Sequence, residues 1–226
     1  MPRKTTSLFF NMADQTQKMI SLLGRMRKQM NGAVADAMYY YGQNYGLNYG
    51  VSLPTVREIA SAEGKDHELA RYLYKQQVRE LRLAAMHIAE PALFSLEEAK
   101  AWADGIINSE LAEEMAFALL PYSASLKEIY AAWTTSDNEF MAYSALMAAS
   151  RTELAAEQEI IHSINKIVSQ YPASRIIAQG AVALLSSAAT LNADRTTIEQ
   201  ALQQLSKGSA TDYIREEMEW RLEALQ

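Results

Sequence analysis

Apolar residues recur at intervals of three and four positions through most of the chain, and sustained alternation of apolar and polar residues is almost absent. The first pattern places apolar side chains on one face of an α-helix, whereas alternation is typical of half-buried strands. The segment boundaries predict about a dozen helices, joined by links of a few residues. We therefore expect an all-α protein.

Two helix starts can be located from their first residues. Ser95 and Glu98 have the spacing of a capping box, in which a hydroxyl and a carboxylate satisfy amide groups at the beginning of a helix. This box predicts a helix that begins near Leu96. Pro54 comes just after Ser52 and suits the first turn of another helix, where the missing amide hydrogen costs nothing.

Short links between helices of similar length predict antiparallel pairs that bury their apolar faces on one another. Such stacking gives a HEAT-like α-solenoid, although the sequence has no exact repeat period. A bundle of long helices is the alternative, because Glu153 to Tyr171 can form one unbroken helix. No linker rich in proline, glycine or serine separates two halves, so residues 1–226 are expected to form a single helical-repeat domain.

Composition excludes several classes of protein. Of the 226 residues, 49% are hydrophobic, which suffices for a sizeable core, and none is cysteine. Disulfides, thiolate zinc sites and cysteine nucleophiles are therefore excluded. No apolar run approaches the roughly 18 to 20 residues of a membrane span, and the chain's start turns polar before a signal-peptide core develops. We expect a cytoplasmic protein without membrane contact.

Charge is distributed unevenly along the chain. The net charge is −6, but residues 1–82 hold 12 Lys and Arg against 7 Asp and Glu, whereas residues 83–226 hold 9 against 20. A basic first third can be an electrostatic footprint for phosphate, and ordinary helix-surface charge is the other interpretation.

Motifs for cofactors and metals are incomplete. Glu159 and His162 have the Glu-x-x-His spacing of carboxylate-bridged di-iron bundles, but the second copy that such a site needs is missing. The glycines at 42, 46 and 50 lack the Gly-Lys-Ser/Thr of a phosphate-binding loop and the strand that precedes a dinucleotide site. We predict no metal and no cofactor.

The segment YYYGQNYGLNYG, residues 39–50, contains five tyrosines and three glycines. Tyr39, Tyr40 and Tyr41 are expected to end the second helix, and a loop follows. Because consecutive helical positions point about 100° apart, one or two of these three tyrosines should pack in the core and at least one should reach the surface.

Tyr45 and Tyr49 belong to the loop itself. Their rings can hold the loop against the helices, which is the interpretation we favour, or stack on the bases or sugars of a nucleic acid.

Basic residues of the first third have helical spacing. Lys75, Arg79 and Arg82 follow i, i+4 and i+7 spacing, which places them on one face of a single helix as a stripe that can bind backbone phosphates. The alternative is a salt-bridged surface, since Glu68 and Glu80 lie close to arginines in the sequence.

Part of this region resembles a known family. The residues Tyr49-Gly50-Val51, Pro54, Val56-Arg57-Glu58-Ile59-Ala60 and Glu80-Leu81-Arg82-Leu83-Ala84-Ala85 are similar to the DNA alkylation repair (AlkD-like) family, best over residues 45–120. The resemblance implies a HEAT-like solenoid with a concave basic surface that grips duplex DNA, damaged DNA included. The candidate nucleic-acid-binding residues are then Arg57, Lys75, Arg79, Arg82, Tyr45 and Tyr49.

The resemblance also implies glycosylase chemistry on alkylated purines, through an aspartate supported by tryptophan and arginine. The tryptophan and aspartate match the segment from Ser109 to Glu114, where Glu110 or Leu111 and then Ala112 stand instead. The arginine matches residues 140–145, which contain none.

Glu113 or Glu114 can replace the aspartate only in a shifted register, because stabilising a cationic sugar requires a positioned carboxylate. Lost or altered base excision is the expectation, with the catalytic residues unknown. The first hypothesis is therefore a DNA-binding member of this group, with an active glycosylase as a variant of it. The second is a protein-interaction scaffold that uses the acidic remainder of the chain and binds no nucleic acid.

Overall fold

The computed structural model describes residues 4–191 and 193–224, with side chains from residue 13 onward. These residues form thirteen α-helices and four short 3-10 helices, and the described backbone contains no strand beyond one isolated bridge, so the all-α prediction is confirmed. The α-helices are α1 (Lys4–Arg27), α2 (Gly32–Tyr40), α3 (Leu53–Ser61), α4 (His67–Tyr74), α5 (Arg79–Ile88), α6 (Leu96–Trp102), α7 (Ser109–Ala118), α8 (Leu126–Trp133), α9 (Glu139–Ala149), α10 (Gln158–Gln170), α11 (Arg175–Thr190), α12 (Arg195–Gln204) and α13 (Ser209–Ala224). The 3-10 helices are η1 (Pro91–Leu93), η2 (Ala103–Gly105), η3 (Leu120–Tyr122) and η4 (Glu153–Ala156).

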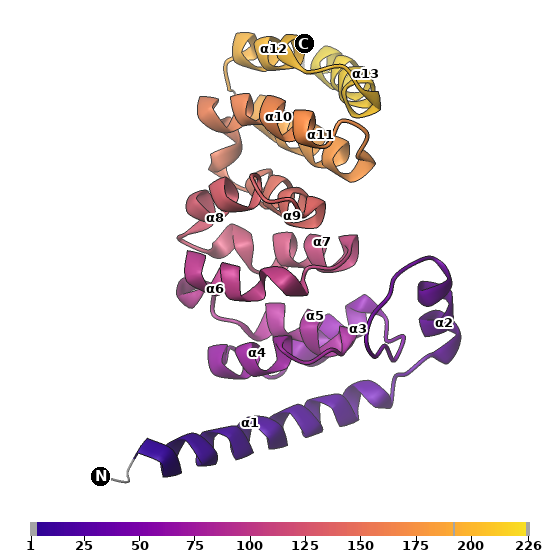
Figure 1. The fold of residues 1–226 in the computed structure, drawn as a ribbon, viewed down its shortest axis with the longest axis vertical. Coiled ribbons are helices and arrows are strands. Elements are labelled where there is room, and N and C mark those ends of the chain that lie inside the picture. Colours follow the sequence, from indigo (N-terminus) through magenta and orange to yellow (C-terminus); the bar gives the residue numbers. More distant parts are fainter. Residues whose placement is uncertain (1–3, 192, 225–226) are drawn as a thin grey trace. The chain divides into compact units, whose positions relative to one another are not determined.

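The chain divides into two compact units, Met1–Leu93 and Phe94–Gln226. In the N-terminal unit, α5 packs against α3 and α4, and α1 packs on the same three helices (Figure 1). Leu22 and Met26 of α1 are fully buried, which fixes this helix on the unit's core. A single domain over residues 1–226 stays a prediction.

The C-terminal unit consists of stacked helix pairs. α7, α9, α11 and α13 follow one another as direct neighbours, while α8 pairs with α9 and α10 pairs with α11 (Figure 1). The contact between α9 and α11 is close, because a Cβ at Gly180 would lie 3.0 Å from the Cβ of Leu146. Stacked antiparallel pairs are the arrangement that the short links predict.

Both predicted helix starts are present. The Ser95 hydroxyl accepts a hydrogen bond from the Glu98 amide (3.3 Å) and α6 begins at Leu96. The Ser52 hydroxyl accepts from the Thr55 amide (3.3 Å), with Pro54 in the first turn of α3. Local capping residues therefore decide where these two helices begin.

The unbroken helix from Glu153 to Tyr171 does not form, and that expectation is wrong. Residues Glu153–Ala156 form η4, and Glu157 is extended (φ −70°, ψ 128°) before α10 begins. Leu154 and Ala155 are buried, and η4 packs on α11. Tertiary packing thus interrupts a helical pattern that the sequence alone would continue.

Candidate nucleic-acid interface

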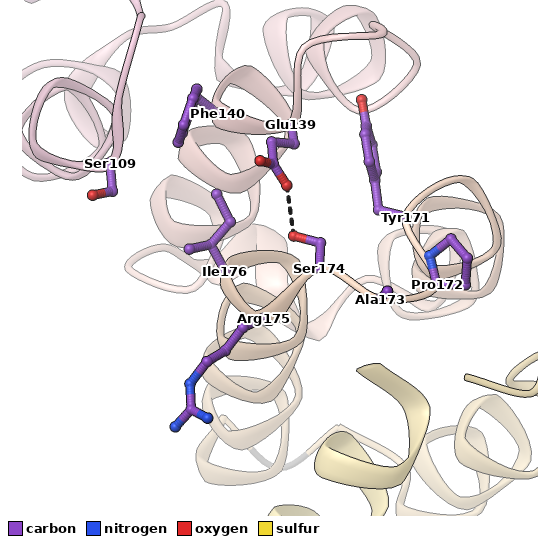
Figure 2. A pocket seen from close by; sticks show the side chains of 9 residues that line it. All are labelled: Ser109, Glu139, Phe140, Tyr171, Pro172, Ala173, Ser174, Arg175 and Ile176. Atoms are coloured by element: carbon purple, nitrogen blue, oxygen red, sulfur yellow. Dashed lines mark hydrogen bonds between the residues drawn. The ribbon is translucent and has the colours of Figure 1, made fainter. Parts of the chain in front are cut away.

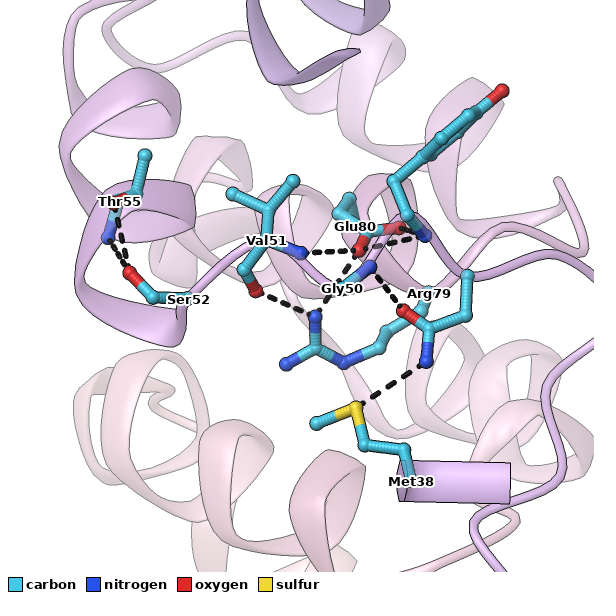
Figure 3. A network of polar contacts seen from close by, with 9 residues as sticks. Met38, Gly50, Val51, Ser52, Thr55, Arg79 and Glu80 are labelled. Carbon is cyan, nitrogen blue, oxygen red and sulfur yellow. Dashed lines mark hydrogen bonds and ion pairs between the residues drawn. The ribbon is translucent and has the colours of Figure 1, made fainter. Parts of the chain in front are cut away.

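A buried ion pair lies at the start of α5. The side chains of Arg79 and Glu80 are 1% and 0% exposed, and Arg79 Nη1 lies 3.1 Å from Glu80 Oε1 (Figure 3). The same Nη1 donates a hydrogen bond to the Val51 carbonyl oxygen (2.8 Å). Burying two charges is costly unless they are paired and hydrogen-bonded, and here both conditions are met.

The Glu80 carboxylate also holds the tyrosine-rich loop. It accepts hydrogen bonds from the amides of Tyr49 (3.1 and 3.2 Å) and Val51 (3.2 Å). The Leu47 amide donates to the Gln77 carbonyl (2.8 Å), and the Arg79 amide donates to the Leu47 carbonyl (2.9 Å). The loop that the sequence predicts between α2 and α3 is therefore fixed along the beginning of α5.

Gly50 lets the loop pass close to α2. Its φ is +68°, and a Cβ there would lie 2.0 Å from the Asn31 carbonyl oxygen. The Asn31 amide donates to the Tyr49 carbonyl oxygen (2.8 Å). The Asn48 side chain accepts a hydrogen bond from the Gly50 amide (2.8 Å) and donates one to the Met38 sulfur (3.3 Å) (Figure 3). Only glycine combines this backbone conformation with so close an approach.

The expected basic stripe is not present on one helix. Lys75 caps the C-terminal end of α4, and α5 begins only at Arg79, after an extended Val78 (φ −123°, ψ 122°). Val78 leaves the helical conformation because it pairs with Leu47 of the loop. Arg79 points into the protein, so its expected place on an exposed basic face is wrong.

The other predicted basic residues remain on or near the surface of the N-terminal unit. Lys75 is exposed, whereas Arg57 and Arg82 are half-buried. Arg82 Nε donates to the Gln76 carbonyl (3.1 Å), and the guanidinium lies over the Tyr74 ring at 5.9 Å from its centre. The Arg82 side chain therefore makes contacts within the protein that help to hold its position.

Several other cations of this unit have acidic partners. Lys18 contacts Asp14 and Asp66, which raises the Lys18 pKa mainly through the hydrogen bond from Lys18 to Asp66 (3.0 Å). Arg25 pairs with Glu63, and Arg71 with Glu68, as the salt-bridged alternative expects.

Two lysines of the N-terminal unit differ from these cations. Within residues 13–191 and 193–224, no carboxylate lies within ion-pair distance of the exposed Lys28 and Lys75. Lys28 is not among the predicted nucleic-acid-binding residues, although its i, i+3 spacing from Arg25 predicts that the two share one helix face at the end of α1.

Tyr45 and Tyr49 are half-buried and lie against arginines of their own unit. The Arg79 guanidinium lies 6.0 Å from the centre of the Tyr45 ring, and that of Arg27 lies 5.9 Å from the Tyr49 ring. Cation–π contacts of this kind help to hold the loop in place.

Tyr39, Tyr40 and Tyr41 end α2 as predicted, but none of them packs in the core. Their exposed fractions are 72%, 82% and 80%. The expectation of one or two buried rings is wrong because α2 itself buries none of its residues, Gly32–Tyr40. Helical geometry sends the three rings in different directions, and every direction leads to solvent.

The positions that match the family's catalytic residues lie on α7 and α9. Leu111 and Ala112 are fully buried, and Glu114 is 2% exposed, so none of the three side chains faces solvent. Glu113 is exposed and accepts a hydrogen bond from the Tyr143 hydroxyl (3.0 Å). Burial, and then the charge of Glu113, raise the pKa of Tyr143 above its usual value of 10.0.

Glu159 and His162 lie on α10, where the His162 ring nitrogen Nδ1 contacts the Gln158 carbonyl oxygen (2.7 Å). In the described part of the chain, no group of three or more His, Asp or Glu side chains is placed to hold a metal ion. Nor does any described helix have both the length and the apolar character needed to cross a bilayer.

The C-terminal unit contains an open pocket of about 570 Å³, beside the N-terminal ends of α7, α9 and α11 (Figure 2). Helix N-termini favour anions. Here, however, the Glu139 carboxylate already lies at this position and accepts a hydrogen bond from the Ser174 hydroxyl (2.7 Å). A negative group built into the pocket disfavours a phosphate in the same place.

Both the sequence and the fold are similar to those of known proteins. The family model described as DNA alkylation repair enzyme matches residues 22–174. No curated protein matches the chain significantly. A solved structure, described as a new family of proteins related to the HEAT-like repeat DNA glycosylases with affinity for branched DNA structures, aligns with a TM-score of 0.67 and 16% sequence identity. The alignment covers 88% of this chain and 93% of that one, and the HEAT-like fold prediction is thereby confirmed.

Proposed function

Because this chain belongs to the DNA alkylation repair enzyme family, we propose that it is a DNA-binding protein with lost or altered base-excision activity. The observation that carries the proposal is the positive charge of residues 1–82, with 12 Lys and Arg against 7 Asp and Glu, in a protein whose net charge is −6. Clustered cations on an otherwise acidic chain attract the phosphate backbone.

The proposed contacts are made by the N-terminal unit. Lys75 provides an exposed charge for phosphate, joined by Arg57, Arg82 and the loop residues Tyr45 and Tyr49. Arg79 contributes indirectly, since its buried pair with Glu80 holds the loop in place. The similar structure belongs to proteins with affinity for branched DNA, which makes the duplex arms of branched or damaged DNA the first substrates to test.

The side chains at the matching positions support the proposed loss or alteration of base excision. Leu111 and Ala112 carry no charge, and the Glu114 carboxylate is buried. Glu110 is half-buried and Glu113 is exposed, and Glu113 has a structural partner in its hydrogen bond with Tyr143. No arginine stands in residues 140–145 to support excision chemistry.

The proposal is tested by fluorescence anisotropy with a labelled duplex, with and without a methylated purine or an abasic site, between about 50 and 200 mM salt. Affinity should fall steeply with salt, and no base should be released. Lys75→Glu should weaken binding and reduce, by about one, the slope of log affinity against log salt concentration. Lys100→Glu, a reversal of another exposed lysine in the acidic unit, is the matched control and should leave affinity unchanged.

A protein-interaction scaffold is the second candidate, favoured by the charge of residues 94–226, where 9 Lys and Arg stand against 19 Asp and Glu. Absence of DNA binding even at low salt would reject the DNA-binding proposal in favour of the scaffold. Base release from the methylated duplex would instead identify an active glycosylase. A cytoplasmic location stays a prediction under either function.

A further inference from the structure

Among the described side chains of the N-terminal unit, the most exposed aromatic residues lie at the tip of α2. Tyr39, Tyr40 and Tyr41 are 72%, 82% and 80% exposed, and the rings of Tyr40 and Tyr41 meet edge to face at 5.2 Å between centres. Neither the fold nor the DNA contacts proposed above use these rings. Contiguous exposed apolar surface marks interaction sites, so these adjacent exposed rings are a candidate binding surface.

The tip is held in place although its side chains are exposed. The amides of Tyr41, Gly42 and Gln43 donate to carbonyl oxygens of α2 at 2.9 to 3.0 Å, which closes the end of the helix. At the other end, the Asn31 side chain accepts from the Val34 amide (3.3 Å), and the Asn31 amide is bonded to the loop. A fixed backbone lowers the entropy cost of presenting the rings to a ligand.

The chain segment that contains the tip is poor in acidic residues, which favours a nucleic acid. Between residues 25 and 50 the chain carries Arg25, Arg27 and Lys28, and its single acidic residue there is Asp36. Lys28 is exposed, and the Arg27 guanidinium lies over the Tyr49 ring. Proteins bind unpaired nucleotides with aromatic rings that stack on the bases and with cations that contact the backbone, and this segment contains both kinds of residue.

The spacing of the rings argues against a protein partner. A helix that docks in a protein groove presents one stripe of side chains at i, i+3, i+4 and i+7. Three consecutive tyrosines point about 100° apart and cannot form such a stripe. Although the rings of Tyr40 and Tyr41 meet edge to face, all three rings are exposed to solvent, which leaves flat surface for bases that have left a regular stack.

We propose that Tyr39, Tyr40 and Tyr41 stack on unpaired bases, and thereby give the protein a preference for forked or gapped DNA over continuous duplex. This inference rests on the proposed DNA-binding function. In a continuous duplex the base faces are covered by their neighbours, so the tyrosines gain nothing there. At a fork or gap at least one base face is free.

The test compares the wild-type protein with a triple variant, Tyr39→Ala, Tyr40→Ala and Tyr41→Ala. Two labelled DNAs are used, a fork with single-stranded arms and a continuous duplex with the same paired sequence. The triple variant should lose about tenfold or more in affinity for the fork and keep its affinity for the duplex, since one base–aromatic stack accounts for such a factor. The corresponding triple phenylalanine variant keeps the rings and should bind the fork like the wild type.

Equal affinity of the wild type and the alanine variant for the fork would overturn the inference and leave the DNA-binding proposal standing. Equal losses on fork and duplex would overturn it too, because the tyrosines would then contact ordinary duplex. A wild-type protein that binds neither DNA rejects both proposals. Analytical ultracentrifugation without DNA tests whether the tyrosines bind a second copy of the chain. A wild-type dimer that is lost in the alanine variant would show this and would also overturn the inference.

Discussion

Helices α2 and α11 are similar in composition but differ in burial. Both are rich in alanine and other apolar residues, GAVADAMYY and RIIAQGAVALLSSAAT. α11 buries eight residues between its neighbours, whereas α2 buries none. An apolar composition therefore does not determine burial; a helix is buried only where neighbouring elements supply a matching surface. α2 is held by its ends and by the loop that follows it, and its side chains remain available for binding.

The buried ion pair should have the largest effect, because it supports the loop next to α2. Glu80→Ala leaves the Arg79 charge buried without its carboxylate and removes the acceptor of the Tyr49 and Val51 amides. We expect a loss of about 3 to 5 kcal/mol in the free energy of unfolding, measured by urea denaturation. Glu58→Ala on the exposed side of α3 is the control and should change stability by less than about 0.5 kcal/mol.

If Glu80→Ala costs no more than this control, the buried pair does not hold the loop. Amide hydrogen exchange locates the effect. The amides of Tyr49 and Val51 should lose protection in Glu80→Ala, because their acceptor is gone.

A matched pair of valines tests the comparison of α2 and α11 directly. Val182 in α11 is 4% exposed and Val34 in α2 is 38% exposed. Val182→Ala removes two buried methyl groups and should cost about 2 kcal/mol in the free energy of unfolding. Val34→Ala should cost less than about 0.5 kcal/mol. Equal losses in thermal or chemical denaturation would mean that α2 is covered in solution.

Alkaline pH should give the smallest effect and concerns the packed aromatics of the C-terminal unit. Burial raises the pKa of Tyr130 to about 12, above its usual value of 10.0. The folded protein then holds this proton more tightly than the unfolded chain, so stability is complete below pH 10 and falls as pH rises toward 12. The loss approaches about 1.4 kcal/mol per pH unit in that range.

Tyr130→Phe serves as the control, since phenylalanine has no proton to lose. Denaturation at pH 8 and pH 11 should show a smaller alkaline loss in the variant than in the wild type. The same alkaline loss in both proteins would contradict the assignment to Tyr130 and point to the other buried phenols, Tyr74 and Tyr143, whose pKa values are also raised by burial.

Much of the fold could be predicted from local signals. Ser95 and Ser52 cap the helices that they were expected to begin, because a capping hydrogen bond spans only three residues. The candidate site was harder to predict. Arg79 and Lys75 have helical spacing, but the chain between them leaves the helix to pair with Leu47, a residue about thirty positions away. Spacing along a sequence says nothing about such a distant partner.

Residue identity and local pattern are enough to predict the all-helical class, the capped helix starts, the uneven charge and the absence of the expected catalytic side chains. These properties depend on residue identity and on neighbours within one or two turns. Three features depend instead on long-range packing: Arg79 is buried while Lys75 is exposed, residues 153–170 form two helical segments, and the tyrosines at the end of α2 face solvent. Burial depends on which surfaces meet, and those surfaces come from residues far apart in the chain.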